Sequence, residues 1–186
     1  MSLSEILQDF DCIAAFLFYG KEKEMTKTLF HLAQANIALS RAPLSDPLMA
    51  DFVAQLAHIN ALADASPGFV WRLQAEDDDT SVINAFRNPL IILNMSIWES
   101  VESLHNYTYR SNHVEPFKKR RNWFEKLDQP HLALWWLPID SRPDGMEACR
   151  RLNLLKEKGP TPEAFTFTRL YDPQGIAIPS RVDAWE

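Results

Sequence analysis

Cysteine and glycine are scarce in this sequence of 186 residues, which has two of the former and five of the latter. Cys12 and Cys149 lie far apart and outside any metal-ligand spacing, which argues against a disulfide framework or a zinc site and is typical of reduced thiols in a cytoplasm. The sequence has no Gly-rich phosphate loop, no flavin or nicotinamide fingerprint, no G-x-S-x-G and no H-E-x-x-H. We therefore expect an enzyme made from this chain to use its substrate's own reactivity or a bound haem.

Long apolar runs and a broad basic surface are missing as well. No stretch reaches the about 18 apolar residues of a membrane-spanning helix, and the apolar stretch at 12–20 follows acidic rather than basic residues, unlike a signal peptide. The net charge of −6 argues against a nucleic-acid-binding protein, and the basic run at 118–121 is best explained as a solvated helix face. We expect a cytoplasmic protein that partners neither membranes nor nucleic acids.

The composition that remains is that of one globular domain, with 46% hydrophobic and 24% charged residues. Residues 1–25 are predicted to form a helical extension. Met25 is a second possible start, because the well-patterned domain begins directly after it. The domain covers 26–172, and a tail at 173–186 is expected to lie over its surface.

Hydrophobic periodicity and turn residues divide the domain into alternating elements. Strands are predicted at 28–39, 69–74, 90–100, 131–139 and 163–171. Helices are predicted at 45–65, 100–110, about 116–127 and 143–159. The stretch 75–89 is predicted to be an acidic loop, too polar for the core. The order β-α-β-β-α-β with an extra C-terminal α-β predicts an α+β fold, namely a ferredoxin-like split βαβ with an antiparallel sheet.

Two of the predicted strands each have one apolar face and one mixed face. The mixed faces consist of Phe30, Leu32, Gln34 and Asn36 in the first strand and Ile92, Asn94, Ser96 and Trp98 in the second. We expect helices to pack on the apolar faces. A bare second face would expose Trp71 or Trp98 in a patch too large for a soluble monomer. The sequence therefore predicts a homodimer whose mixed faces line a cavity between the subunits.

Several stretches between residue 28 and about 170 carry a recognisable pattern, namely HLAQANIALSRAPLSDPL, NMSIWESVESLHNYTYRSNHVEPFKKRRNWFE, LALWWLP and GPTPEAFTF. The chain resembles an uncharacterised bacterial family that is itself similar to the antibiotic-biosynthesis-monooxygenase group of dimeric α+β barrels. The resemblance implies that fold. It leaves the activity open, since the wider superfamily includes cofactor-independent oxygenases, haem-degrading proteins, isomerases and members with no known reaction.

His113 is the first candidate for chemistry. In helical spacing it shares one side with Tyr109 and Phe117. A neutral imidazole is a good general base near pH 7. In the haem-degrading proteins that the chain resembles, a histidine at a similar point of this helix is the iron ligand. The alternative is that His113 only caps or packs the helix break beside Pro116.

Asn36, Asn94 and Trp98 form the second candidate set. In the monooxygenases that the chain resembles, an Asn and a Trp in such positions hold an aromatic substrate and a developing oxyanion. An amide donor can stabilise an enolate without a metal. The alternative is that the two amides satisfy each other in the interior of a dimer.

Aromatic and basic residues on the strands and the following helix complete the candidates for substrate binding. Arg72 or Arg110 could bind a carboxylate or a phenolate. Trp71 and Trp135 each have a neighbour on the opposite strand face, so one of each pair is expected to point into the cavity. Core packing is the alternative for these rings.

The function predicted from the mixed strand faces and from the resemblance is binding of a small, mostly apolar or aromatic molecule. The predicted reaction is cofactor-independent monooxygenation of an aromatic or polyketide-like substrate, with His113 as the base and Asn36 and Asn94 holding the oxyanion. Trp71 and Trp98 would stack the ring. One alternative is haem binding with His113 as axial ligand. Another is a non-enzymatic dimer that binds a ligand or serves a structural role.

Overall fold

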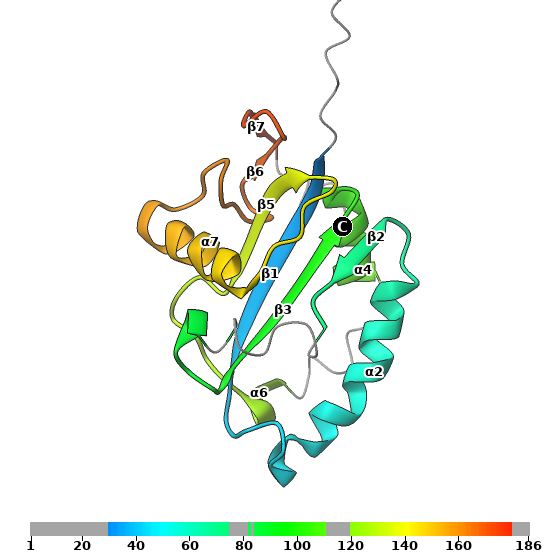
Figure 1. Ribbon diagram of the computed structural model, residues 1–186, viewed down its shortest axis with the longest axis vertical. Coiled ribbons are helices and arrows are strands. Elements are labelled where there is room, and N and C mark those ends of the chain that lie inside the picture. The colour runs from blue at the N-terminus through cyan, green and yellow to red at the C-terminus, as the bar shows by residue number, and fades with distance from the viewer. Residues whose placement is uncertain (1–29, 75–81, 83, 111–119, 180–186) are drawn as a thin grey trace, which may run out of the picture.

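An antiparallel sheet lies at the centre of the computed structural model, which describes residues 30–74, 82, 84–110 and 120–179 (Figure 1). Its strands follow the order β2-β3-β1, and both β4 and β5 pair with β1. Their bounds are β1 (Phe30–Ser40), β2 (Phe69–Arg72), β3 (Ile91–Trp98), β4 (Phe124–Glu125) and β5 (Leu132–Pro138). With α2 (Ala50–Asp64) after β1 and α4 (Val101–Arg110) after β3, this confirms the predicted ferredoxin-like α+β fold.

Helix ends follow the capping residues in the sequence. Asp46 accepts a hydrogen bond from the Leu48 backbone N–H at 2.9 Å and so starts the short 3-10 turn η1 (Pro47–Met49) that leads into α2. Asp144 caps α7 (Gly145–Lys158) in the same way, accepting from the Glu147 N–H at 2.8 Å. The helix predicted from 143 thus begins within two residues of the expected position, whereas the helix predicted from 45 begins as η1 at 47 and becomes α-helical at 50.

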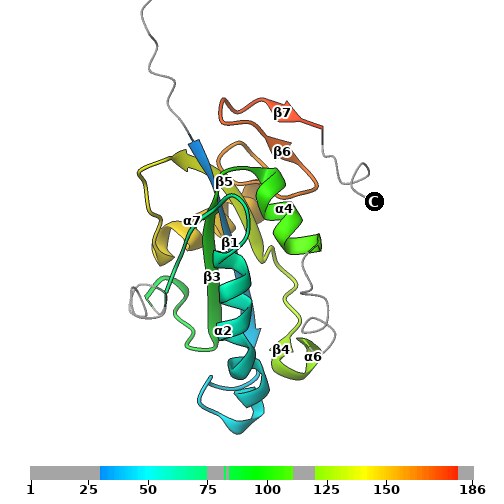
Figure 2. The same ribbon diagram turned by 90° about the vertical axis from the view of Figure 1, so that its right-hand side faces the viewer.

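The apolar face of the sheet is covered by α7, which Figure 2 shows on the side opposite α4. Ala33, Ala35 and Ala133 form a fully buried floor of small side chains, on which Leu152 and Leu155 of α7 pack. Small residues on the strands let the helix approach closely. The prediction that helices pack on this face is confirmed.

At the Trp98 end, α4 and the segment after α7 cover the mixed face, so this end is not the bare interface that was predicted. Leu104 of α4 packs in one buried cluster with Leu32, Trp98 and Leu134, together with Phe165 from the segment after α7. The reason is that Leu32 and Trp98 make this end of the mixed face as apolar as the opposite face of the sheet. The expectation of an open wall between two subunits is therefore wrong at the Trp98 end.

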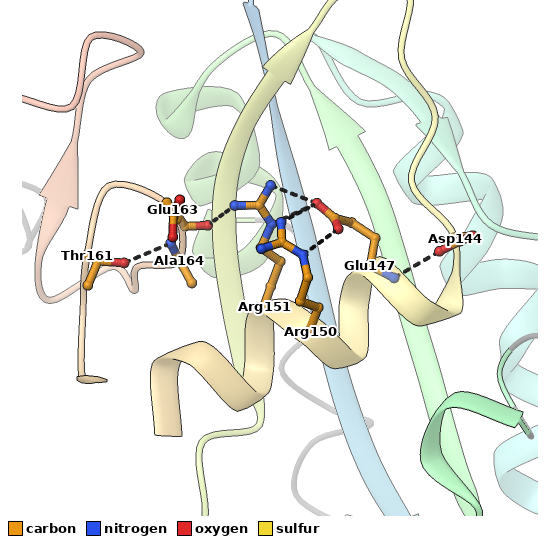
Figure 3. Close-up of polar contacts among 7 residues, drawn as sticks. All are labelled: Asp144, Glu147, Arg150, Arg151, Thr161, Glu163 and Ala164. Atoms are coloured by element: carbon orange, nitrogen blue, oxygen red, sulfur yellow. Dashed lines mark hydrogen bonds and ion pairs between the residues drawn. The ribbon is translucent and has the colours of Figure 1, made fainter. Parts of the chain in front are cut away.

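A polar cluster ties α7 to the segment that follows it (Figure 3). The Glu147 carboxylate accepts from Arg150 Nε at 2.9 Å and from Arg151 Nε at 2.8 Å. Arg151 also donates to the Glu163 backbone carbonyl. The hydrogen bond from Arg150 holds the pKa of the Glu147 carboxyl below its ordinary value, so the cluster keeps its charge at neutral pH.

The segment after α7 is not the long strand predicted at 163–171. The chain reverses twice instead, with the backbone bridges Thr161–Ala164 and Thr166–Arg169, and a backbone bridge joins it to the sheet where Phe165 pairs with Leu134. A short hairpin follows, whose strands β6 (Leu170–Tyr171) and β7 (Ala177–Ile178) have two residues each. The apolar and polar residues of 163–171 do alternate, but two close turns divide this stretch and prevent one long strand.

Two further predictions need correction. The helix expected to reach about residue 127 ends as α6 (Arg120–Trp123), and Phe124 then pairs with Ser40 in the sheet. Within the acidic stretch predicted as a loop too polar for the core, residues 84–86 are helical and Phe86 packs against the apolar-face cluster. Phe86 and the hydrogen bond from Cys149 Sγ to the Ala85 carbonyl hold residues 84–86 against the core.

Several predictions fall on parts of the chain outside the described residues, namely the helix at 1–25, His113, Phe117, the start of the helix predicted at about 116–127 and the end of the tail at 173–186. Within the described ranges, every helix is too short or too polar to cross a membrane.

Candidate functional site

A continuous chain of side-chain hydrogen bonds runs along the mixed face of β1 and β3. Trp98 Nε1 donates to Ser96 Oγ at 2.8 Å, and Ser96 Oγ donates to Gln34 Oε1 at 2.9 Å. Gln34 Nε2 then donates to Asn36 Oδ1 at 2.8 Å. We call these four residues and Asn94 the polar strip.

Strand geometry and register bring the polar strip together. Residues two apart on a strand share a face, and the antiparallel register places Gln34 opposite Ser96 and Asn36 opposite Asn94. Directly opposite side chains lie about 5 Å apart at Cβ. The structure thus puts Asn36, Asn94 and Trp98 on one face, as their predicted strand positions require.

Burial falls steadily along the polar strip. Trp98, Ser96 and Gln34 are buried, Asn36 is half-buried and Asn94 is exposed. The strip therefore begins beneath α4 and ends at the surface, where two neighbouring amides meet solvent. That open end, rather than the Trp98 ring, is where a ligand can reach the strip.

Aromatic rings enclose the buried end of the polar strip. Tyr107 of α4 stacks on Trp98 with ring centroids 5.0 Å apart, and Phe69 contacts Trp98 edge-on at 5.4 Å. Burial is the main cause that raises the pKa of Tyr107 to about 12; the negative charge of Asp64 contributes to this rise and the positive charge of Arg72 opposes it. The Tyr107 hydroxyl is consequently neutral at physiological pH.

The raised pKa of Tyr107 predicts a loss of stability in alkali. The unfolded chain releases this proton near pH 10, the folded chain only near pH 12, so between these values the folded state holds more protons and the free energy of unfolding falls as pH rises. Because the ring is partly exposed, we expect less than the ideal value of about 1.4 kcal/mol per pKa unit. Urea unfolding from pH 9 to 12 checks this. Tyr107→Phe should flatten the curve, and an equally steep curve in that variant would contradict the assignment.

Arg72 lies on the same face as the polar strip, opposite Ser96. Its guanidinium is bound to Asp64 at the end of α2, through Nε–Oδ1 at 2.9 Å and Nη2–Oδ2 at 3.3 Å. The predicted role of Arg72 in binding an acidic group would therefore require a ligand carboxylate to compete with Asp64.

Trp71 and Trp135, both predicted to contact a substrate, lie on the apolar face instead of beside the polar strip. Trp135 is 1% exposed and has the Arg151 guanidinium 5.5 Å above its ring. Trp71 pairs with Ile97 and has Arg142 5.8 Å from its ring centroid. The structure does not bring these rings together with Asn36 and Asn94. On β5 it is Trp136 that shares the mixed face, opposite Leu32.

Two other candidates belong to α4. Tyr109 is 59% exposed and packs with His105 and Phe167 rather than with the polar strip, at centroid distances of 4.5 and 6.0 Å. Arg110 closes the helix, and its side chain lies outside the described part of the structure.

Gln34 and Ser96 were not predicted as site residues. The alternation of the two strands already placed Gln34 and Ser96 on the mixed faces. An amide on one strand and a hydroxyl on the other could have predicted a hydrogen bond between them. For the chain segments that the structure describes, no group of three or more His, Cys, Asp or Glu side chains is arranged to hold a metal ion.

Comparison with known proteins identifies a family and one structural likeness. The family model described as "domain of unknown function (DUF3291)" matches residues 31–180. The crystal structure of SnoaB, a cofactor-independent oxygenase from Streptomyces nogalater, is similar over 61% of this chain and 94% of that chain, with 13% identity and a TM-score of 0.37. No curated protein matches the chain.

Proposed function

The chain belongs to the DUF3291 family, whose description assigns no activity, and we propose from its own geometry that it binds a small aromatic molecule at the open end of the polar strip. The observation that carries the proposal is the hydrogen-bond chain that leads from buried Trp98 to the half-buried amide of Asn36, beside exposed Asn94. A buried polar chain that reaches the surface supplies fixed polar groups to a ligand.

Apolar side chains flank these amides, which supports a mostly apolar ligand. Leu132 lies opposite Asn36 on β5, and Ile92 lies opposite Ala38 one pleat beyond Asn94. Both are half-buried. Sites that combine an apolar wall with a few placed polar groups are typical of small-molecule binding.

The reaction we propose is cofactor-independent monooxygenation of a phenol or enol. A base removes a proton, the resulting carbanion attacks O2, one oxygen atom enters the substrate as a carbonyl and the other leaves as water. Amide N–H groups would stabilise the oxyanion that forms on the way. Because the Tyr107 hydroxyl stays protonated, it is a poor base, and the role of base stays with His113 as a prediction.

We also propose that the protein forms a homodimer through the part of the apolar face that α7 leaves uncovered. Trp71, Val70 and Ile91 pack against the apolar-face cluster and are only half-buried. Apolar side chains gathered on one face are typical of a surface that a partner covers.

A thermal-shift screen with phenols and aryl ketones tests the binding proposal. We expect a ligand-dependent rise in melting temperature that Asn36→Ala and Asn94→Ala each reduce. Asn153→Ala is the matched control, since this amide is exposed on α7, away from the polar strip, and donates to Cys149 Sγ at 3.5 Å. The absence of any shift in the wild type would favour a non-enzymatic structural protein.

Oxygen uptake with the ligands that bind then tests the reaction. We expect turnover in the wild type and at least a hundredfold loss in His113→Ala, the range typical of a missing general base. Equal rates in the two proteins would exclude His113 as the base. Binding without oxygen uptake would leave a ligand-binding protein that is not an oxygenase.

A further inference from the structure

We infer that the polar strip has a fixed direction set by the Trp98 indole, so that its open end presents hydrogen-bond donors and selects ligands with an acceptor oxygen. Ser96 and Gln34 are then positioning residues. The inference rests on the proposed binding site and narrows its ligands to aryl carbonyls and phenolates.

The direction starts at Trp98 because an indole N–H donates and never accepts. Trp98 is fully buried, and its Nε1 lies 2.8 Å from Ser96 Oγ. Ser96 must therefore accept this hydrogen bond. Its own single hydrogen is left for Gln34 Oε1, at 2.9 Å.

The same logic fixes both amides. Since Gln34 Oε1 accepts from Ser96, Gln34 Nε2 faces Asn36 and donates to its Oδ1 at 2.8 Å. Turning the Gln34 amide over would leave Asn36 Oδ1 without its donor and the buried Ser96 hydrogen without its acceptor, and the latter alone costs about 1–3 kcal/mol. Because Asn36 Oδ1 accepts the hydrogen bond from Gln34, Asn36 presents Nδ2 and its two hydrogens to a ligand.

Ligand selection follows from the donor end. A carbonyl or phenolate oxygen accepts from Asn36 Nδ2, whereas a ring with only an N–H group finds no acceptor there. Asn94 is exposed, and within the described residues its amide makes no side-chain hydrogen bond, so it can turn either way. Discrimination between acceptor and donor ligands is thus the property of Asn36 and the residues that orient it.

Two fused bicyclic probes of similar size test the inference, 1-indanone with a carbonyl acceptor and indole with only an N–H donor. We expect the wild type to bind 1-indanone roughly tenfold more tightly, which corresponds to about 1.4 kcal/mol. Trp98→Phe and Ser96→Ala should lower this ratio towards one, because Gln34 is then free to turn. In the Asn94→Ala background the preference should persist.

Ser40→Ala is the matched control, because Ser40 is a buried serine of β1 that bonds the Leu90 carbonyl at 3.0 Å and lies outside the polar strip. It should keep the ratio of the wild type. Equal affinity of the wild type for both probes would overturn the inference while leaving the binding site intact.

A ligand-free measurement separates failure of the inference from failure of the proposed function. Proton NMR of the 15N-labelled protein should show through-space contacts from the Gln34 Nε2 hydrogens to Asn36, and slow exchange of the Trp98 indole hydrogen. Contacts from these hydrogens to Ser96 instead would overturn the inference, whatever binds. If neither probe binds, the proposed function fails and this spectrum alone decides the direction.

Discussion

Replacing Trp98 with alanine is expected to lower the free energy of unfolding by about 3–5 kcal/mol, the range for deleting a buried aromatic ring. Trp98 is fully buried and packs with Phe69, Tyr107 and Leu104 around it. Removing the ring leaves a cavity that these neighbours fill only in part. The loss corresponds to a melting temperature lower by roughly 6–20 °C in a chain of this size, which circular dichroism measures directly.

Trp98→Phe is the control for this result. It keeps an aromatic ring between Phe69 and Tyr107 and removes mainly the indole N–H, so we expect well under half of the loss seen with alanine. If both variants lost the same stability, the hydrogen bond to Ser96 rather than the packing of the ring would account for the effect of Trp98.

A Gly68→Ala substitution is expected to cost about 2–6 kcal/mol, because two penalties add. Gly68 has φ +78°, a conformation that strains any other residue by about 1–3 kcal/mol. A Cβ atom there would lie 2.2 Å from Ser103 Oγ on α4, and relief of such an overlap costs typically about 1–3 kcal/mol more. Urea unfolding measures the sum.

Gly159→Ala separates the two penalties. Gly159 also has positive φ, +69°, but a Cβ atom there meets nothing within 4 Å. This variant should therefore lose only the strain of about 1–3 kcal/mol. Equal losses at Gly68 and Gly159 would mean that the loop before β2 moves away from α4 without resistance.

Local patterns in the sequence predicted most of the fold. The alternation in 28–39 and 90–100 predicts β1 and β3, and the apolar periodicity in 45–65 and 143–159 predicts α2 and α7. These signals work because each depends only on neighbours along the chain. Asn36 and Asn94 were chosen from that alternation together with the family resemblance, and the register then placed them opposite each other.

The remaining errors concern relations across the sheet. On β5 a period of two makes Trp135 and Trp136 equivalent, and only the pairing of Trp136 with Leu32 decides which ring joins the mixed face. Likewise, the strand pattern shows that Trp98 faces away from Ile97, but not that α4 returns to cover it. Gln34 and Ser96 became site residues only through a hydrogen bond that joins two strands.

The contact of Phe165 with β5 sets a lower limit on the length of a chain that folds by itself. All strands of the central sheet and α7 precede Gly159, so a fragment ending there would contain the complete ferredoxin-like topology. It would lack Phe165, Phe167, Leu170 and Tyr171, which supply half of the buried residues beneath α4. We therefore expect the part of the chain that folds by itself to be longer than the part that contains the ferredoxin-like topology. Truncated or fused proteins should keep the chain at least through Tyr171.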